Sequence, residues 1–167
     1  MGVNGLGCRA TDVTLNRRIR PAEPSEGPFL TELTIRSKAH WGYSEAFMKA
    51  ATPELEFLAE KFRPDFLVYV LELDSTRVGF CSLLRVDDNT AELHDLFIDP
   101  LHIGCGHGKA LWLFALDLAR RRGFKRLTLT ADPNAEPFYL AQGAVRIGEK
   151  PSQVQDDRSL PVLEYLL

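Results

Sequence analysis

The sequence predicts an α/β fold built on a mixed β-sheet. Two β-rich runs, 66–73 and 77–85, are joined by the polar turn 74–76, which predicts a hairpin. A third apolar strand, 91–98, leads through three alternating glycines into a helical run with apolar residues at i, i+3, i+4 and i+7. Because the chain has 167 residues, 45% of them apolar, and shows no internal repeat, we expect one domain over residues 18–167.

The N-terminal part of the chain begins without clear periodicity. Residues 1–17 are rich in glycine and polar residues, so we expect an extension that is partly disordered or adds a strand. A short strand over 19–22 is expected next, followed by a first helix. The segment 37–43, which has an unusual composition, predicts a loop after that helix.

The later elements are bounded by residues that favour helix caps and turns. The segment 44–61 predicts helix with a break near Pro53, where Thr52 can cap the second piece. The helix after the three glycines should end at Gly123, and Asn134 should cap a further short helix. Strands are expected at 127–131, 145–149 and 162–166.

Gly104, Gly106 and Gly108 separate the strand 91–98 from the next helix. Glycine leaves the backbone free of side chains where several N–H groups point the same way, and the positive helix end reinforces them. This combination predicts a site for a phosphate or pyrophosphate group. A nucleotide-binding P-loop would need Ser or Thr where Ala110 stands, and the spacing of the glycines does not fit the dinucleotide fingerprint.

Two motifs give the chain a resemblance to the GNAT superfamily of N-acetyltransferases. The first, over 98–108, reads Ile-Asp-Pro-Leu-His-Ile-Gly-Cys-Gly-His-Gly and resembles that family's acyl-coenzyme A loop, with Ile103 in place of Gln or Arg. The second, over 134–144, reads Asn-Ala-Glu-Pro-Phe-Tyr-Leu-Ala-Gln-Gly-Ala, with Ala144 in place of an aromatic residue. The resemblance extends from about residue 19 to the C-terminus.

The resemblance implies a central, mostly antiparallel sheet of six or seven strands that is splayed at its middle and flanked by about four helices. It implies acetyl-CoA as co-substrate and no metal. The pantetheine arm would enter the gap between the splayed strands, and the pyrophosphate would rest on the glycine loop. The residues it assigns to acetyl-CoA are Leu96, Phe97, Ile98, Ile103, Gly104, Cys105, Gly106, His107, Gly108, Lys109, Asn134 and Phe138.

The attack of an amine on a thioester needs the neutral amine, and only about one lysine-like amine in a few thousand is neutral at pH 7. A general base therefore helps, and the resemblance points to Glu92 first and His94 second. Strand alternation places both on the face of Leu96 and Ile98 and turns Asp95 the other way. The alternative interpretation is that Glu92 is an ordinary surface carboxylate and that His94 is a hydrogen-bonded core residue.

Tyr139 matches the family's tyrosine that gives a proton to the departing CoA thiolate, although packing of a helix face is the alternative. The resemblance implies that acceptor specificity comes from the first helices with their connecting loop and from the last strands with their loop. Trp41 and Tyr43 could hold a cation against their rings, or could simply fix their loop to the core. In the segment 151–161, two aspartates could receive an amine and Arg158 a carboxylate, unless the loop is merely solvated.

Composition narrows the class of protein. A net charge of −3 argues against a nucleic-acid partner, and no apolar run reaches the length of a membrane helix. Cys8, Cys81 and Cys105 lack metal-type spacing, so we expect a cytoplasmic protein without a metal. The resemblance thus implies an N-acetyltransferase with a small-molecule or peptide amine as acceptor, and it is compatible with a homodimer. A non-catalytic acyl-CoA-binding or regulatory module is the alternative.

Overall fold

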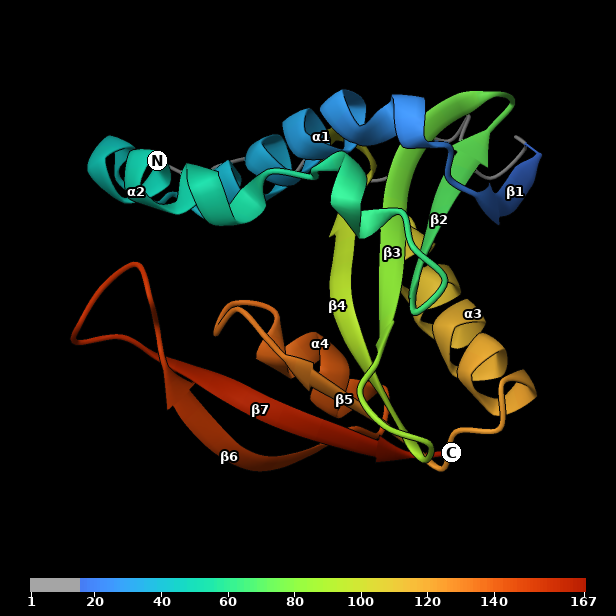
Figure 1. Cartoon of the computed structure of the whole chain (residues 1–167). Helices are drawn as coiled ribbons and strands as arrows, with labels where there is room; N and C mark the ends of the chain where they lie inside the picture. Colours follow the sequence, from blue (N-terminus) through green and yellow to red (C-terminus); the bar gives the residue numbers. More distant parts are fainter. Residues whose placement is uncertain (1–15) are drawn as a thin grey trace.

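The computed structural model of the protein describes residues 16–167 (Figure 1). The structure does not describe residues 1–15, so most of the predicted extension over residues 1–17 lies outside the described residues. Cys8 lies outside them as well. The strands are β1 (Arg17–Pro21), β2 (Phe66–Leu73), β3 (Thr76–Arg85), β4 (Thr90–Ile98), β5 (Arg126–Thr130), β6 (Val145–Pro151) and β7 (Ser159–Leu166). The helices are α1 (Gly27–Ala39), α2 (Glu45–Leu55), α3 (His107–Arg121) and α4 (Glu136–Ala141), with 3-10 turns η2 (Pro24–Glu26), η3 (Ala59–Lys61) and η4 (Pro100–His102).

The seven strands form one sheet in the order β1-β2-β3-β4-β5-β7-β6. Every neighbouring pair is antiparallel except β4 and β5, which are parallel. The predicted mixed and mostly antiparallel sheet with four helices is therefore confirmed.

The β2–β3 hairpin shows how local sequence sets the register of the sheet. Its two loop residues, Asp74 and Ser75, have φ values of +43° and +72°. Two left-handed residues in sequence are typical of a type I′ turn, whose twist matches that of the flanking strands. The Asp74 carboxylate also accepts the backbone N–H of Asn16 at 2.9 Å, which ties the hairpin to the residue before β1.

Helices cover both faces of the sheet and bury two apolar clusters. On one face, Leu30 and Leu33 of α1 are fully buried in a cluster with Phe80, which we term the α1-side cluster. On the other face, Leu111 and Trp112 of α3 are fully buried in a larger cluster, which we term the α3-side cluster. The apolar spacing along α3 thus corresponds to the side of the helix that packs on the sheet. No helix within residues 16–167 combines the length and apolarity needed to span a bilayer.

The predicted helical segment is interrupted, but at residues 56–58 rather than at Pro53. α2 begins after Ser44, whose side chain accepts the N–H of Phe47 at 3.1 Å, and it continues through Pro53 to Leu55. The Thr52 hydroxyl caps nothing and instead donates to the carbonyl of Met48 at 2.8 Å. Proline lies so close to the C-terminal end of α2 that its missing N–H interrupts little of the helical hydrogen bonding.

Two other helix ends differ from the prediction. α1 continues to Ala39 and so takes up the first residues of the predicted loop 37–43. Asn134 does not cap α4, because the N-cap position belongs to Ala135 and has no side-chain cap. Asp132 organises this turn instead, since its carboxylate accepts the N–H of Asn134 at 2.9 Å.

A buried carboxylate connects the edge of the sheet to the start of α1. Two nitrogens of Arg20 donate to Glu26 at 2.8 and 2.9 Å, and Arg77 donates at 3.1 Å. Arg20 also donates to Glu72 of β2 at 2.6 Å. The side chain of Glu26 is only 9% exposed. The hydrogen bonds from Arg20 outweigh the cost of burial and lower the pKa of Glu26 from 4.5 to about 2.

Replacing Glu26 by Gln should therefore lower the free energy of unfolding at pH 7 by roughly 2–3 kcal/mol. A carboxyl group whose pKa is depressed on folding stabilises the fold above its unfolded pKa of 4.5 and loses that effect as the pH falls toward 2. The difference between wild type and E26Q in urea unfolding should accordingly shrink at acidic pH. E54Q, which changes an exposed carboxylate of α2, is the control and should leave stability unchanged. A pH-independent difference would contradict this assignment.

Candidate active site

The sheet opens into a wedge between β4 and β5 (Figure 1). Parallel pairing joins only Thr90–Glu92 to Arg126–Thr128. Beyond these pairs β4 has β3 as its sole sheet partner, and β5 has β7. The predicted splay is thus present, and it leaves one edge of residues 93–98 without a ladder partner.

The glycine loop at the start of α3 leaves several backbone N–H groups without acceptors. Gly104 and Gly106 have φ values of +84° and +80°, and a Cβ built on either would meet no atom within 4 Å. Gly106 is the N-cap residue and provides no side-chain cap. Within residues 16–167, the amides of Gly104, Gly106, Gly108 and Lys109 donate no hydrogen bond. Free N–H groups at the start of a helix are typical of an anion-binding site. α3, with 15 residues, is long enough to reinforce such a site with its positive end.

A β-bulge at His94 changes which side chains of β4 share a face. Leu93 pairs with Leu83, but the next pair is Asp95 with Ser82, so His94 is the extra residue. Leu93, Leu96 and Ile98 consequently all belong to or pack on the α3-side cluster. The prediction that Glu92 and His94 share a face with Leu96 and Ile98 is therefore wrong.

Asp95 has the orientation that alternation predicts relative to Leu96 and Ile98, but the bulge places it on the same face as Glu92. The Asp95 carboxylate accepts the Ser82 hydroxyl at 2.5 Å. Phe97, two residues on, lies against Phe80 in the α1-side cluster, with ring centroids 5.7 Å apart. Asp95 is thus on the sheet face of Phe97 and opposite Leu96 and Ile98, because alternation is regular beyond the bulge.

Glu92 and His94 form a half-exposed acid–imidazole pair. The Glu92 Oε1 and His94 Nδ1 atoms are 3.3 Å apart, and the His94 ring lies edge-on to Phe66 at 5.3 Å. The hydrogen bond to Glu92 raises the pKa of His94 above its ordinary value, although burial opposes the shift. The same bond lowers the pKa of Glu92. When the pair carries a single proton, that proton therefore lies on the imidazole rather than on the carboxylate.

Tyr139 is buried beside the α3-side cluster, and its ring packs edge-on against Trp112 at 5.5 Å. Its hydroxyl makes no hydrogen bond within residues 16–167. Burial first, and then the nearby Cys81 and Asp95 groups, raise the pKa of Tyr139 well above its ordinary value. The phenol is therefore protonated throughout the neutral range. Phe138, its neighbour, lies against Gly108, where a Cβ would meet the ring at 3.7 Å.

Five polar residues meet across the wedge in what we term the Asp132 cluster: Lys38, Tyr43, Asp132, Asn134 and Arg158. Lys38 and Arg158 donate to one Asp132 oxygen at 3.0 and 3.1 Å. The Tyr43 hydroxyl lies 2.8 Å from both oxygens of Asp132, and it accepts from Arg158 at 2.6 Å and from Asn134 at 3.0 Å. Burial and the hydrogen bond to Asp132 raise the pKa of Tyr43 to about 12, so the phenol stays neutral.

Sequence reasoning missed two of the five residues of this cluster, Lys38 and Asp132. Asn134 was predicted to contact pantetheine, but its amide here donates to Tyr43 and Asp132. Asp132 was not singled out, although an aspartate that directly follows a strand and precedes Pro-Asn is typical of a side-chain-stabilised turn. Nothing in the local sequence distinguishes Lys38 from any other lysine in the last turn of a helix.

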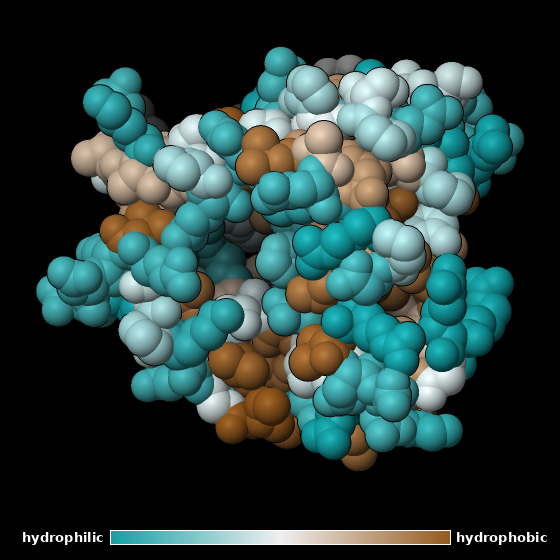
Figure 2. Space-filling view, viewed as in Figure 1, coloured by the Kyte–Doolittle hydropathy of each residue, from teal (hydrophilic) through white to brown (hydrophobic). Residues whose placement is uncertain are grey.

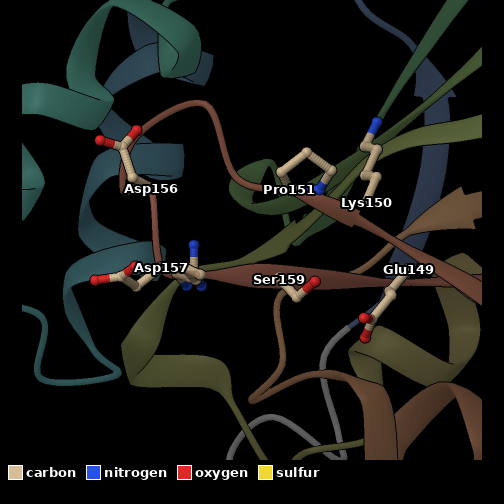
Figure 3. A pocket seen from close by; sticks show the side chains of 7 residues that line it. Glu149, Lys150, Pro151, Asp156, Asp157 and Ser159 are labelled. Carbon is tan, nitrogen blue, oxygen red and sulfur yellow. The ribbon is translucent and has the colours of Figure 1, made fainter.

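The other predicted acceptor residues are not members of the Asp132 cluster. Trp41 is 44% exposed and contacts the ring of His40. A pocket of about 280 Å³ lies along β6, β7 and their connection, and in Figure 3 Asp156 and Asp157 project away from Lys150 and Glu149. Within the described part of the chain, no three His, Cys, Asp or Glu side chains come together as a metal site would require.

Comparison with known proteins gives a consistent result. The model of the acetyltransferase (GNAT) family matches residues 32–144. An uncharacterized ycf52-like N-acetyltransferase of Prochlorococcus marinus is 33% identical over 66 residues, which are 40% of this chain. The match spans only 37% of the length of that relative.

Solved structures share the fold over nearly the whole chain. A GCN5-related N-acetyltransferase from Rhodopseudomonas palustris has a TM-score of 0.75 at 22% identity, covering 92% of this chain and 98% of that one. A PaiA N-acetyltransferase from Thermoplasma acidophilum, in complex with coenzyme A, has a TM-score of 0.72 at 24% identity, covering 92% and 100%.

Removing the Glu92 carboxylate should lower the pKa of His94. The Glu92 hydrogen bond is the largest influence that raises this pKa, and burial, which lowers it, would remain in E92Q. The pKa can be followed by NMR titration of the imidazole C–H signals. E164Q, which alters a β7 carboxylate paired with Arg126, is the control and should leave the His94 titration unchanged. An unchanged titration in E92Q would show that the pair does not form in solution.

Proposed function

The chain belongs to the acetyltransferase (GNAT) family, and we propose that it transfers an acetyl group from acetyl-CoA to a primary amine by direct attack in a ternary complex. One observation carries the proposal. The uncapped, glycine-rich start of α3 lies directly after the end of β4 that borders the wedge. The proposed pyrophosphate site would therefore lie next to an unpaired strand edge, as an acyl-CoA requires.

The proposed binding mode uses backbone groups for most of the co-substrate. The amides between Ile103 and Lys109 would hold the pyrophosphate, helped by the positive end of α3. The pantetheine arm would add to the free edge of β4 at Leu96–Ile98, where its amides replace the missing strand. Ile103 supplies no polar side chain, and it packs instead on the α3-side cluster. Asn134 would reach the co-substrate only if its amide left the Asp132 cluster.

The Glu92–His94 pair would accept the proton of the attacking amine. A base is most effective when the pKa of its conjugate acid lies near the working pH. The hydrogen bond raises the pKa of His94 and lowers that of Glu92, so the imidazole is the stronger base of the two. The imidazole would therefore take the proton, while Glu92 orients the ring and stabilises the imidazolium.

Tyr139 would supply a proton when the carbon–sulfur bond breaks. The amine nitrogen attacks the thioester carbonyl carbon, and collapse of the tetrahedral species expels the CoA thiolate, whose conjugate thiol has a pKa of about 8.5. Because the pKa of Tyr139 is raised, its phenol still holds its proton at neutral pH. Burial in the α3-side cluster also fixes its ring. The acceptor would be a small-molecule or peptide amine.

Acceptor-dependent release of free thiol from acetyl-CoA tests the proposal directly. Wild type should bind acetyl-CoA in calorimetry and release thiol with at least one member of a panel of amines, amino acids and peptides. G106A should weaken acetyl-CoA binding by roughly tenfold, because a left-handed residue with a Cβ costs about 1–2 kcal/mol and the loop must shift. G148A, a glycine of β6 with open surroundings and no positive φ, is the matched control.

The remaining outcomes separate the alternatives. Binding of acetyl-CoA without thiol release on any acceptor would favour a non-catalytic acyl-CoA-binding module on this fold. Absence of acetyl-CoA binding in the wild type would contradict the proposed use of the α3 loop.

Tyr139→Phe should lower turnover by roughly 10²–10⁴-fold, the usual contribution of a general acid. The affinity for acetyl-CoA and the unfolding midpoint should hardly change, since the hydroxyl makes no hydrogen bond within residues 16–167 and the ring remains. Single-turnover thiol release, with acetyl-CoA titrated separately, measures both effects. F138L, which alters the neighbouring ring at Gly108, is the comparison and should act mainly on acetyl-CoA affinity. Unchanged turnover in Y139F would remove Tyr139 from the mechanism.

A further inference from the structure

The Asp132 cluster joins the two parts of the sheet on the side where β4 and β5 have separated. Lys38 and Tyr43 come from the end of α1 and the loop 40–44, while Asp132, Asn134 and Arg158 come from the segments after β5 and before β7. Within residues 16–167, the only other side-chain hydrogen bond between residues 16–98 and 126–167 is that of Thr128 to Ala91, at the closed end of the wedge. The cluster is therefore the polar link at the open end.

The charged members of the cluster are largely withdrawn from water. Side-chain exposure is 15% for Lys38, 15% for Asp132 and 14% for Arg158. The Arg158 guanidinium also lies over the rings of Tyr43 and Phe47, 5.1 Å from each centroid. Ion pairs in such surroundings are screened far less than surface pairs, and removing one partner leaves an uncompensated charge.

The backbone of Arg158 takes part in hydrogen bonds that close the loop 152–158. The loop 152–158 is closed upon itself, because the Ser152 N–H donates to the Arg158 carbonyl at 2.7 Å and the Arg158 N–H donates to Gln155 at 3.1 Å. Ser152 is buried, and its hydroxyl accepts the N–H of Val154 at 3.2 Å. The loop should consequently move as a unit with Arg158, its attachment to the opposite side of the wedge.

We propose that Arg158 is a positioning residue for the acceptor: it latches the loop 152–158 onto the loop 40–44 through Tyr43 and Asp132, and so fixes the opening through which the amine reaches the wedge. The inference rests on the proposed function. Figure 2 shows a hollow on this face, which in Figure 1 lies between α2, β4 and the connection of β6 with β7. Arg158 would thus shape the acceptor opening without touching the reacting atoms.

The latch can be tested independently of turnover. In hydrogen exchange, R158Q and Y43F should exchange amides in the segments 40–47 and 151–159 about tenfold faster, since each loses hydrogen bonds to a charged partner. R158K keeps the charge and should restore part of the protection. R146Q removes a β6 arginine that pairs outside the cluster, with Glu136 and Glu149, and should exchange like wild type.

Steady-state kinetics of the acetyl transfer test whether the latch affects the acceptor. R158Q should raise the KM for the acceptor about tenfold, while kcat falls less and the Kd of acetyl-CoA is unchanged. Equal exchange in R158Q and wild type would overturn the latch, whether or not an acceptor has been found. Faster exchange with an unchanged acceptor KM would overturn the positioning role. Absence of turnover in the wild type would contradict the proposed function, while exchange would still decide whether the latch exists.

Discussion

The early end of pairing between β4 and β5 is the constraint on which the rest of the site depends. Sheet strands normally satisfy each other's backbone groups, and an unmade hydrogen bond is costly once water is excluded. Here the pairing stops at Glu92 and Thr128, so the edge of β4 beyond them needs another partner. The two diverging parts must also be held together by something other than the ladder. α3 does so on one face, because its Trp112 is buried in one apolar cluster with Leu93 of β4 and Leu129 of β5.

The bulge at His94 determines what chemistry lies beside the wedge. One inserted residue allows Leu93 and Leu96 to enter the same apolar cluster although they are three positions apart. The polar residues between them, His94 and Asp95, are placed outside that cluster. The strand therefore keeps its apolar packing on the α3 side and carries an acid–imidazole pair next to the last β4–β5 ladder pair. A regular strand could not satisfy both requirements with this sequence.

Two polar clusters share the task of fixing the elements around the sheet, and they differ in charge. The cluster around Glu26 contains two arginines and two carboxylates and joins consecutive strands of one edge to α1. The Asp132 cluster contains two cations and one carboxylate, and it spans segments 94 and 115 residues apart in sequence. Buried ion pairs contribute more to a defined geometry than to net stability. The Asp132 cluster needs a defined geometry more than added stability, because it sets the distance between the two sides of the wedge.

The sequence by itself determined the local features of this protein. The β2–β3 hairpin, the α3 helix, the glycine loop and the family motifs all depend on residues close in the chain, whose backbone preferences act within a few positions. Tertiary structure alone decided three other matters. The bulge at His94 arises from pairing with β3, so strand alternation placed Glu92 and His94 on the wrong face. Pro53 is tolerated because α2 ends two residues later. Asp132 gathers Lys38 and Arg158 only because the fold brings three distant segments together, and no local spacing encodes such a contact.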